Sequence, residues 1–190
     1  MSAQRRVGAK DSQVRAKLVE AATEIVREEG CGALTAGRLA RTVGLSRQSV
    51  HYYFGTIEDI FVEILRSQAG EVRNRAFKSF ESGNPLRVIW EFRRATSAMT
   101  SELMAMAIRS ETIRTEMASY MDELTSISIA AVEDFARRNA LDLPAPPEVV
   151  VTVLTNLSYT VALGKQLGAT VGHEATIDAV ERWLRDIEHS

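Results

Sequence analysis

Proline is almost confined to one place in this sequence, and that restricts the fold class. The chain has 190 residues and four prolines, of which three fall within residues 144–147 and the fourth is Pro85. Proline is the strongest breaker of a helix interior, so the long stretches on either side are free to be helical. Few segments show the strict apolar-polar alternation of a half-buried strand. The sequence therefore predicts an all-α protein.

Composition favours a globular protein with a sizeable core. Apolar residues make up 45% of the chain and charged residues 25%, unlike disordered or low-complexity sequences. The longest apolar run, residues 148–167, is interrupted by polar residues, and no secretory leader opens the chain. We therefore expect a cytoplasmic protein without a membrane partner. One cysteine, Cys31, and three scattered histidines predict no disulfide, no metal site and no cofactor.

Charge is distributed unevenly along the chain. Residues 1–56 hold nine Lys or Arg against five acidic residues, a net charge of +4, whereas residues 57–190 carry a net charge of −6. A basic head on an acidic body indicates an anionic partner for the head alone.

Apolar periodicity and capping residues predict the order of the helices. The first should run from residue 11 or 12 to Glu29, and Thr35 and Ser46 can cap two short helices that follow. Later helices are expected to start after a capping box at residues 56–59, at Pro85, near residue 110, at Pro147 and near residue 174. We divide the chain into a flexible basic arm (1–10), a three-helix domain (11–56) and a larger helical domain (57–190).

The spacing of small and apolar residues in the two short helices is typical of a helix-turn-helix. Ala40 is small where the helices would cross, Gly44 allows a positive φ in the turn, and Val50 would pin the second helix onto the first. The second helix would then present polar groups suited to base edges and phosphates, namely Arg47, Gln48, Ser49, His51 and Tyr52. The alternative interpretation is an αα corner with a solvated polar face.

Residues 12–66 resemble the TetR family of bacterial transcriptional regulators. The resemblance includes the amphipathic first helix, the pairs Glu29-Gly30 and Leu34-Thr35, and residues 54–61 after the third helix. It implies an N-terminal helix-turn-helix domain followed by a helical domain that binds a ligand and dimerises.

The resemblance also implies roles for individual residues. Ser46 would cap the recognition helix, and Arg47, Gln48 and Ser49 would face the major groove. His51, Tyr52 and Tyr53 would reach phosphates or bases. Thr35 would lie beside the DNA backbone. The chain departs from the family at His51, where tyrosine is usual, and at Ile57, where a lysine often contacts phosphate. The basic arm is either a minor-groove contact or a disordered terminus.

In the larger domain the resemblance implies a dimer interface made by the last two helices. The residues expected there are Leu163, Leu167, Val180, Trp183, Leu184 and Ile187. It also implies a small-molecule pocket, and flexible or aromatic side chains with two polar neighbours are its candidates: Trp90, Met99, Met106, Met117, Tyr120, Met121, Asn156 and Tyr159. The alternative for both sets is that they form the core of a single chain.

These observations predict a homodimeric repressor that binds a palindromic operator in double-stranded DNA and is released by a small apolar or aromatic ligand. The alternative is a DNA-binding protein of the same fold that acts as an activator or nucleoid-associated factor through a protein partner, without a ligand. An enzyme is not expected, because no glycine-rich phosphate loop or nucleophile elbow occurs. A helical enzyme or carrier that uses the pocket is the third class.

Overall fold

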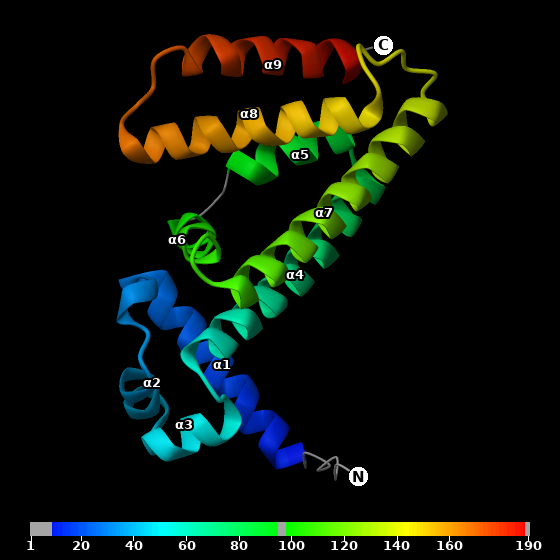
Figure 1. Cartoon of the computed structure of the whole chain (residues 1–190). Coiled ribbons are helices and arrows are strands. Elements are labelled where there is room, and N and C mark those ends of the chain that lie inside the picture. Colours follow the sequence, from blue (N-terminus) through cyan, green and yellow to red (C-terminus); the bar gives the residue numbers. More distant parts are fainter. Residues whose placement is uncertain (1–8, 95–97, 189–190) are drawn as a thin grey trace. The chain divides into compact units, whose positions relative to one another are not determined.

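The computed structural model describes the backbone of residues 9–94 and 98–188, and every regular element in these ranges is a helix (Figure 1). The elements are α1 (Ala9–Glu29), the 3-10 turn η1 (Cys31–Ala33), α2 (Ala36–Val43), α3 (Arg47–Tyr53), α4 (Ile57–Ser82), α5 (Pro85–Arg94), α6 (Ala98–Ala107), α7 (Glu111–Arg138), α8 (Pro147–Leu167) and α9 (His173–Glu188). The predicted all-α fold is confirmed. No helix in the described ranges combines the length and apolar character needed to cross a membrane.

Helix boundaries follow the local signals in the sequence. Pro147 occupies the first turn of α8, and Gly168 ends that helix in the left-handed conformation with φ 75°. The start of α1 differs from the prediction, because the helix already includes residues 9 and 10 of the expected arm. Residues 1–8 of that arm lie outside the described residues.

The helices pack into two units. The first contains α1, η1, α2, α3 and α6, with α4 up to Ala69 and α7 up to Ala118. The second contains α5, α8 and α9 with the remainders of α4 and α7. Packing therefore groups α6 and the first turns of α4 and α7 with the helix-turn-helix. The functional boundary after residue 56 stays a prediction.

The first unit is built around the apolar stripe of α1. Leu18 and Ala22 are fully buried, and the same core receives Leu39 from α2, Val50 from α3 and Ile60 from α4. Leu18, Ala22, Ile25 and Val26 follow one another at helical spacing and are buried, whereas Lys17, Glu20 and Glu24 are exposed, so one face of the helix is buried and the other is solvated.

The core of the second unit is centred on Trp90 of α5, which is fully buried. Its indole N–H donates to Glu181 Oε1 of α9 at 2.9 Å. Arg87, one turn earlier, bonds Glu181 at 3.0 Å and Glu188 at 2.5 Å. The hydrogen bonds to Glu188 and Glu181 raise the pKa of Arg87 above its ordinary value, so the guanidinium stays charged. These contacts hold α9 against α5 over two turns.

Gly164 of α8 makes room for a side chain of α9. A Cβ at residue 164 would lie 2.1 Å from Cε1 of His173 and 2.6 Å from the backbone oxygen of Ala169. The oxygen belongs to the main chain and cannot rotate away. The close approach of the α8–α9 connection to α8 therefore requires glycine at this position.

We expect Gly164→Ala to lower the free energy of unfolding by about 1–3 kcal/mol, because overpacking displaces backbone as well as a side chain. Gly70→Ala is the matched control, since Gly70 lies inside α4 with open space around the added methyl group. That variant should gain about 0.5–1 kcal/mol from the better helix propensity of alanine. Urea unfolding followed by circular dichroism measures both, and equal stability of the two variants would contradict the packing argument.

Candidate nucleic-acid interface

The first helix of the motif, α2, starts at the predicted cap. Thr35 has an extended backbone, and its Oγ1 accepts the backbone N–H of Arg38 at 3.1 Å. The Thr35 side chain is exposed. Since the hydroxyl oxygen accepts the capping bond, its hydrogen is left to donate to an external acceptor.

The turn between α2 and α3 depends on Gly44. This residue has φ 70° and ψ 31°, a left-handed conformation that glycine adopts without a Cβ penalty. The N–H of Leu45 closes the turn by donating to the oxygen of Ala40 at 2.9 Å. Only 3% of Ala40 and 1% of Val50 is exposed, and the two short helices are in contact, so both side chains are buried as the spacing predicts.

The second helix, α3, is capped by Ser46. Its Oγ accepts the backbone N–H of Ser49 at 3.0 Å, and the two hydroxyl oxygens lie 2.8 Å apart. A side chain cap of this kind fixes the first turn of a helix that has only seven residues. At the other end, the N–H of Phe54 donates to the oxygen of Val50 at 2.9 Å.

The outward face of α3 carries most of the predicted contact residues. Arg47, Gln48, His51 and Tyr52 are exposed, and Tyr52 keeps 64% of its area. Ser49 and Tyr53 are half-buried. The ring of Tyr53 meets that of Tyr52 edge-on, with centroids 5.1 Å apart. A cation, an amide, an imidazole and a phenol thus share one solvent-facing surface of a rigidly held helix.

One residue that supports this surface from α2 was not among those predicted from the sequence. A Cβ at Gly37 of α2 would lie 2.7 Å from Nε of Arg47, so the guanidinium rests directly on the α2 backbone. Gly37 therefore seats the side chain of Arg47. A glycine inside an otherwise helical pattern was the available signal.

The start of α4 follows α3 closely and has the predicted capping box. The N–H of Thr56 donates to Oδ2 of Asp59 at 2.8 Å, and the N–H of Asp59 donates to Oγ1 of Thr56 at 3.1 Å. The carboxylate of Asp59 therefore accepts a hydrogen bond at the start of the helix, and this bond limits the repulsion that the carboxylate would exert on a nearby phosphate.

The predicted ligand residues are distributed over both units. Met106 and Met117 belong to the first unit, whereas the others that the structure describes belong to the second. Trp90 and Met117 are buried, Met106, Tyr120 and Tyr159 are half-buried, and Met121 and Asn156 are exposed. The side chain of Met99 lies outside the described residues. Their role in ligand binding stays a prediction.

The predicted dimer residues differ in exposure. Leu184 and Val180 are buried in the core of their own unit. Leu163, Trp183 and Ile187 are half-buried, and Leu167 keeps 73% of its area exposed. Three further apolar residues of α8, in the helix expected to form the interface, are exposed: Val149, Val153 and Leu157.

The described part of the second unit contains cavities of about 600, 680 and 380 Å³. The first is lined by Glu91, Val161, Ala162, Lys165, Thr170, His173 and Ile177. The second lies along α7 and α4 and includes Phe80, Ala131 and the paired Asp134 and Arg138. The third is an apolar groove between α8 and α9. No cluster of His, Cys, Asp and Glu in the described chain is suited to hold a metal ion.

Cys31 lies in η1 and is held by Glu102 of α6. The carboxylate of Glu102 accepts the backbone N–H of Cys31. Burial raises the pKa of the Cys31 thiol to about 12, and the hydrogen bond to Glu102 and its negative charge act in the same direction. The thiol is therefore protonated at neutral pH, which removes the thiolate that a redox sensor needs.

Comparison with known proteins points to one family. Residues 18–64 match the family described as bacterial regulatory proteins, tetR family. A curated relative, the HTH-type transcriptional regulator BetI of Rhizobium meliloti strain 1021, is 34% identical over 68 residues. The match covers 36% of this chain and 34% of that protein, about a third of its length.

Solved structures share the fold over nearly the whole chain. A transcriptional regulator from Saccharomonospora viridis, in complex with choline, has a TM-score of 0.71 and 16% identity over 94% of this chain and 97% of that one. Escherichia coli NemR in its reduced form has a TM-score of 0.74 and 19% identity, and the match covers 88% of this chain and 95% of that one. A TetR transcription regulator from Haloarcula marismortui has a TM-score of 0.74 and 17% identity, and the match covers 90% of this chain and 96% of that one.

The raised pKa of Cys31 predicts an inert thiol. With a pKa of about 12, about one thiol in ten thousand is ionised at pH 8, so alkylation by iodoacetamide should be at least about a hundredfold slower than for free cysteine. The rate should rise as the pH approaches 12 and should recover at pH 8 in denaturant. Glu102→Gln should accelerate the reaction in the folded protein. Modification of the native protein at the rate of free cysteine would contradict this assignment.

Proposed function

We propose that this chain, whose residues 18–64 match the tetR family of bacterial regulatory proteins, is a homodimeric transcriptional repressor. It binds a palindromic operator in double-stranded DNA and is released by a small molecule with an apolar body. The observation that carries the proposal is the exposed face of α3, whose orientation is fixed by a side chain cap at one end and by buried Val50 in the middle.

The side chains on α3 suit the major groove. Arg47 offers the paired N–H donors that read guanine, and the amide of Gln48 matches the donor and acceptor pair of adenine. His51 and Tyr52 are exposed on the same helix and provide donors for phosphate oxygens. Thr35 adds a hydroxyl donor at the start of α2. We therefore assign base contacts to the first turn of α3 and backbone contacts to its neighbours.

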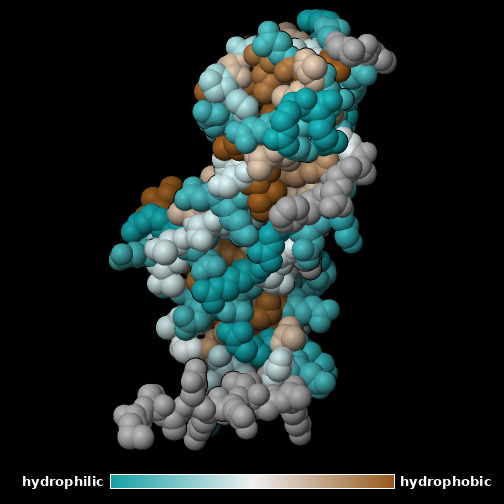
Figure 2. Space-filling view, turned by 90° about the vertical axis from the view of Figure 1, so that its right-hand side faces the viewer, coloured by the Kyte–Doolittle hydropathy of each residue, from teal (hydrophilic) through white to brown (hydrophobic). Residues whose placement is uncertain are grey.

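Dimerisation is supported by an apolar stripe on α8. Val149, Val153 and Leu157 follow one another at intervals of four residues and keep 45%, 51% and 36% of their areas exposed. They line the groove of about 380 Å³ together with Trp183 of α9. Figure 2 shows apolar side chains at the surface of the part that carries α8 and α9, in the upper half of the view. A second copy of this stripe provides a self-complementary partner.

A two-fold dimer explains why the operator is expected to be a palindrome. One helix of seven residues reads only a few base pairs, and a symmetric pair of such helices reads two inverted half-sites. Half-site spacing is then set by the dimer, so a small molecule that changes the arrangement of the subunits lowers the affinity for DNA.

For the effector we propose the cavity of about 600 Å³ between α5, α8 and α9. Its volume lies in the range of ligand pockets, roughly 300–1,000 Å³. Val161, Ala162 and Ile177 give it an apolar wall, and Lys165 and His173 add polar groups that can orient a ligand. The neighbour from Saccharomonospora viridis was solved with choline, which makes small amphipathic compounds the first set to test.

Selection of bound sequences from random duplex DNA tests the main proposal. We expect a palindrome to be enriched by the wild type. Arg47→Ala and Gln48→Ala should each weaken binding to it by about 5- to 150-fold and relax the preference at one position per half-site. Arg27→Ala is the control, because Arg27 is an exposed cation of α1 that pairs with Glu24 of the same helix. Absence of enrichment at low salt as well as physiological salt would overturn the proposal.

The same assay tests the effector site. Compounds that release the wild type from the selected DNA should fail to release Ala162→Leu, whose added atoms fill the cavity of about 600 Å³. Ala131→Leu fills the cavity along α7 instead and serves as the control. Release of both variants by the same compounds would assign the effector to another site.

The dimer is tested by placing a charge in the α8 stripe. Val153→Glu should raise the dissociation constant of the dimer at least about a hundredfold, since burying an unpaired charge costs several kcal/mol and occurs twice in a symmetric interface. Val171→Glu is the matched control, because Val171 is a fully exposed valine of the α8–α9 connection. Sedimentation velocity over a concentration series measures both. An unchanged dimer in Val153→Glu would show that α8 does not form the interface.

A further inference from the structure

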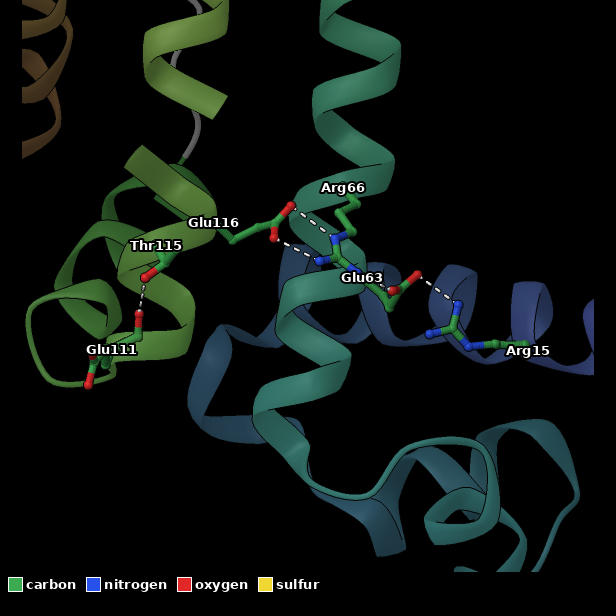
Figure 3. Close-up of polar contacts among 6 residues, drawn as sticks. All are labelled: Arg15, Glu63, Arg66, Glu111, Thr115 and Glu116. Atoms are coloured by element: carbon green, nitrogen blue, oxygen red, sulfur yellow. Dashed lines mark hydrogen bonds and ion pairs between the residues drawn. The ribbon is translucent and has the colours of Figure 1, made fainter. Parts of the chain in front are cut away.

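Arg15 of α1 joins two elements that lie far from it in the sequence. Its Nη1 donates to Oε2 of Glu63 in α4 at 2.8 Å. Its Cζ lies over the ring of Phe54, 4.9 Å from the ring centroid. Figure 3 shows the side chain of Arg15 extending from α1 toward Glu63. One guanidinium thus makes an ion pair and a cation–π contact at the same time.

Phe54 is the residue at which α3 ends. Only 2% of its area is exposed. Its N–H donates to the backbone oxygen of Val50 and closes the last turn of the helix. Because α3 has only seven residues, its direction depends on how its two ends are held. Ser46 holds the first end by a local cap, whereas the second end is held by packing around the ring that Arg15 covers.

Glu63 connects Arg15 to a second ion pair. Its other oxygen bonds Nη1 of Arg66 at 3.1 Å, and Arg66 donates two bonds of 2.9 Å to the two oxygens of Glu116 in α7 (Figure 3). The hydrogen bond from Arg15 lowers the pKa of Glu63 below its ordinary value, so this carboxylate stays ionised at neutral pH. The side chain of Glu63 is 19% exposed, which protects its contacts from screening. A continuous row of charges therefore runs from α1 through α4 to α7.

We propose that Arg15 is a positioning residue for α3, and that the row Arg15, Glu63, Arg66 and Glu116 ties the end of α3 to α7. Arg15 sets the direction of the recognition helix without contacting a base. The proposal deepens the proposed DNA-binding function. It rests on that function for the measurement of operator binding, which is one of two measurements. The other measurement is made on the free protein, so the two ideas can fail separately.

Hydrogen exchange of the full-length protein gives the measurement that needs no DNA. In Arg15→Met, which keeps an unbranched side chain but has no charge, the amides of residues 50–54 should exchange about tenfold faster than in the wild type. Arg27→Met is the matched control on the same helix, since the ion pair of Arg27 stays within α1. It should leave exchange in α3 unchanged. Arg15→Lys retains a cation and should lie between the wild type and Arg15→Met.

The connection to α7 has its own matched pair of variants. Glu116→Gln removes the charge that binds Arg66, whereas Glu123→Gln removes the charge that binds Arg73 seven residues further along the same helix. We expect Glu116→Gln to raise exchange in residues 50–54 about threefold and Glu123→Gln to leave it unchanged. Equal effects of the two variants would remove α7 from the proposal.

Binding to the selected operator gives the second measurement. Arg15→Met should bind about tenfold more weakly than Arg27→Met, while the preferred bases stay the same because Arg47 and Gln48 are intact. Faster exchange in α3 with no DNA binding by the wild type would refute the proposed function and keep the positioning role. Exchange that rises equally in every helix of Arg15→Met would show a purely structural role, and Glu63→Gln repeats the test if Arg15→Met does not fold. Unchanged exchange in both would overturn the proposal.

Discussion

The burial of Phe54 is the constraint on which the DNA-binding face depends. This ring ends α3, lies under the guanidinium of Arg15 and precedes the capping box that starts α4. Only Phe54, Gly55 and Thr56 separate the two helices, so α3 cannot change direction without displacing a fully packed aromatic ring or breaking the cap at Thr56. Burial of one side chain thus converts a seven-residue helix, too short to be stable alone, into a rigid surface.

Features determined by neighbours in the sequence could be predicted. The caps at Thr35 and Ser46, the left-handed Gly44 and the start of α8 at Pro147 each depend on three or four consecutive residues. The contacts of Arg15 with Glu63 and of Cys31 with Glu102 could not be predicted, because they join residues 48 and 71 positions apart. In a single sequence such residues look like ordinary members of a solvated helix face or a loop.

The predicted residues of the larger domain show a different difficulty. Helix α8 is apolar on more than one face: Val150, Leu154 and Val161 are buried in the core, while Val149 and Val153 are exposed. Periodicity identifies such a helix, but it does not tell which stripe packs inside the chain. Leu184 and Trp90 fit the pattern of an interface and of a pocket, and the structure buries both in the core of the second unit, while their predicted roles stay predictions. Side chain volume and neighbouring helices decide the assignment, and both require the fold.

The ion pairs between α4 and α7 bear on how an effector could alter α3. Arg66 pairs with Glu116, and Arg73 pairs with Glu123, so both bonds join residues fifty positions apart and lie seven residues from one another. A constant offset means that the two helices run in the same direction and in one register. A slip by one helical turn, about 5.4 Å, would break both bonds at once. The pairs therefore favour joint movement of α4 and α7 over sliding, and the chain passes from one packing unit to the other within each of these helices. Glu63 and Arg15 are the next members of this row of contacts, and Arg15 lies over Phe54 at the end of α3.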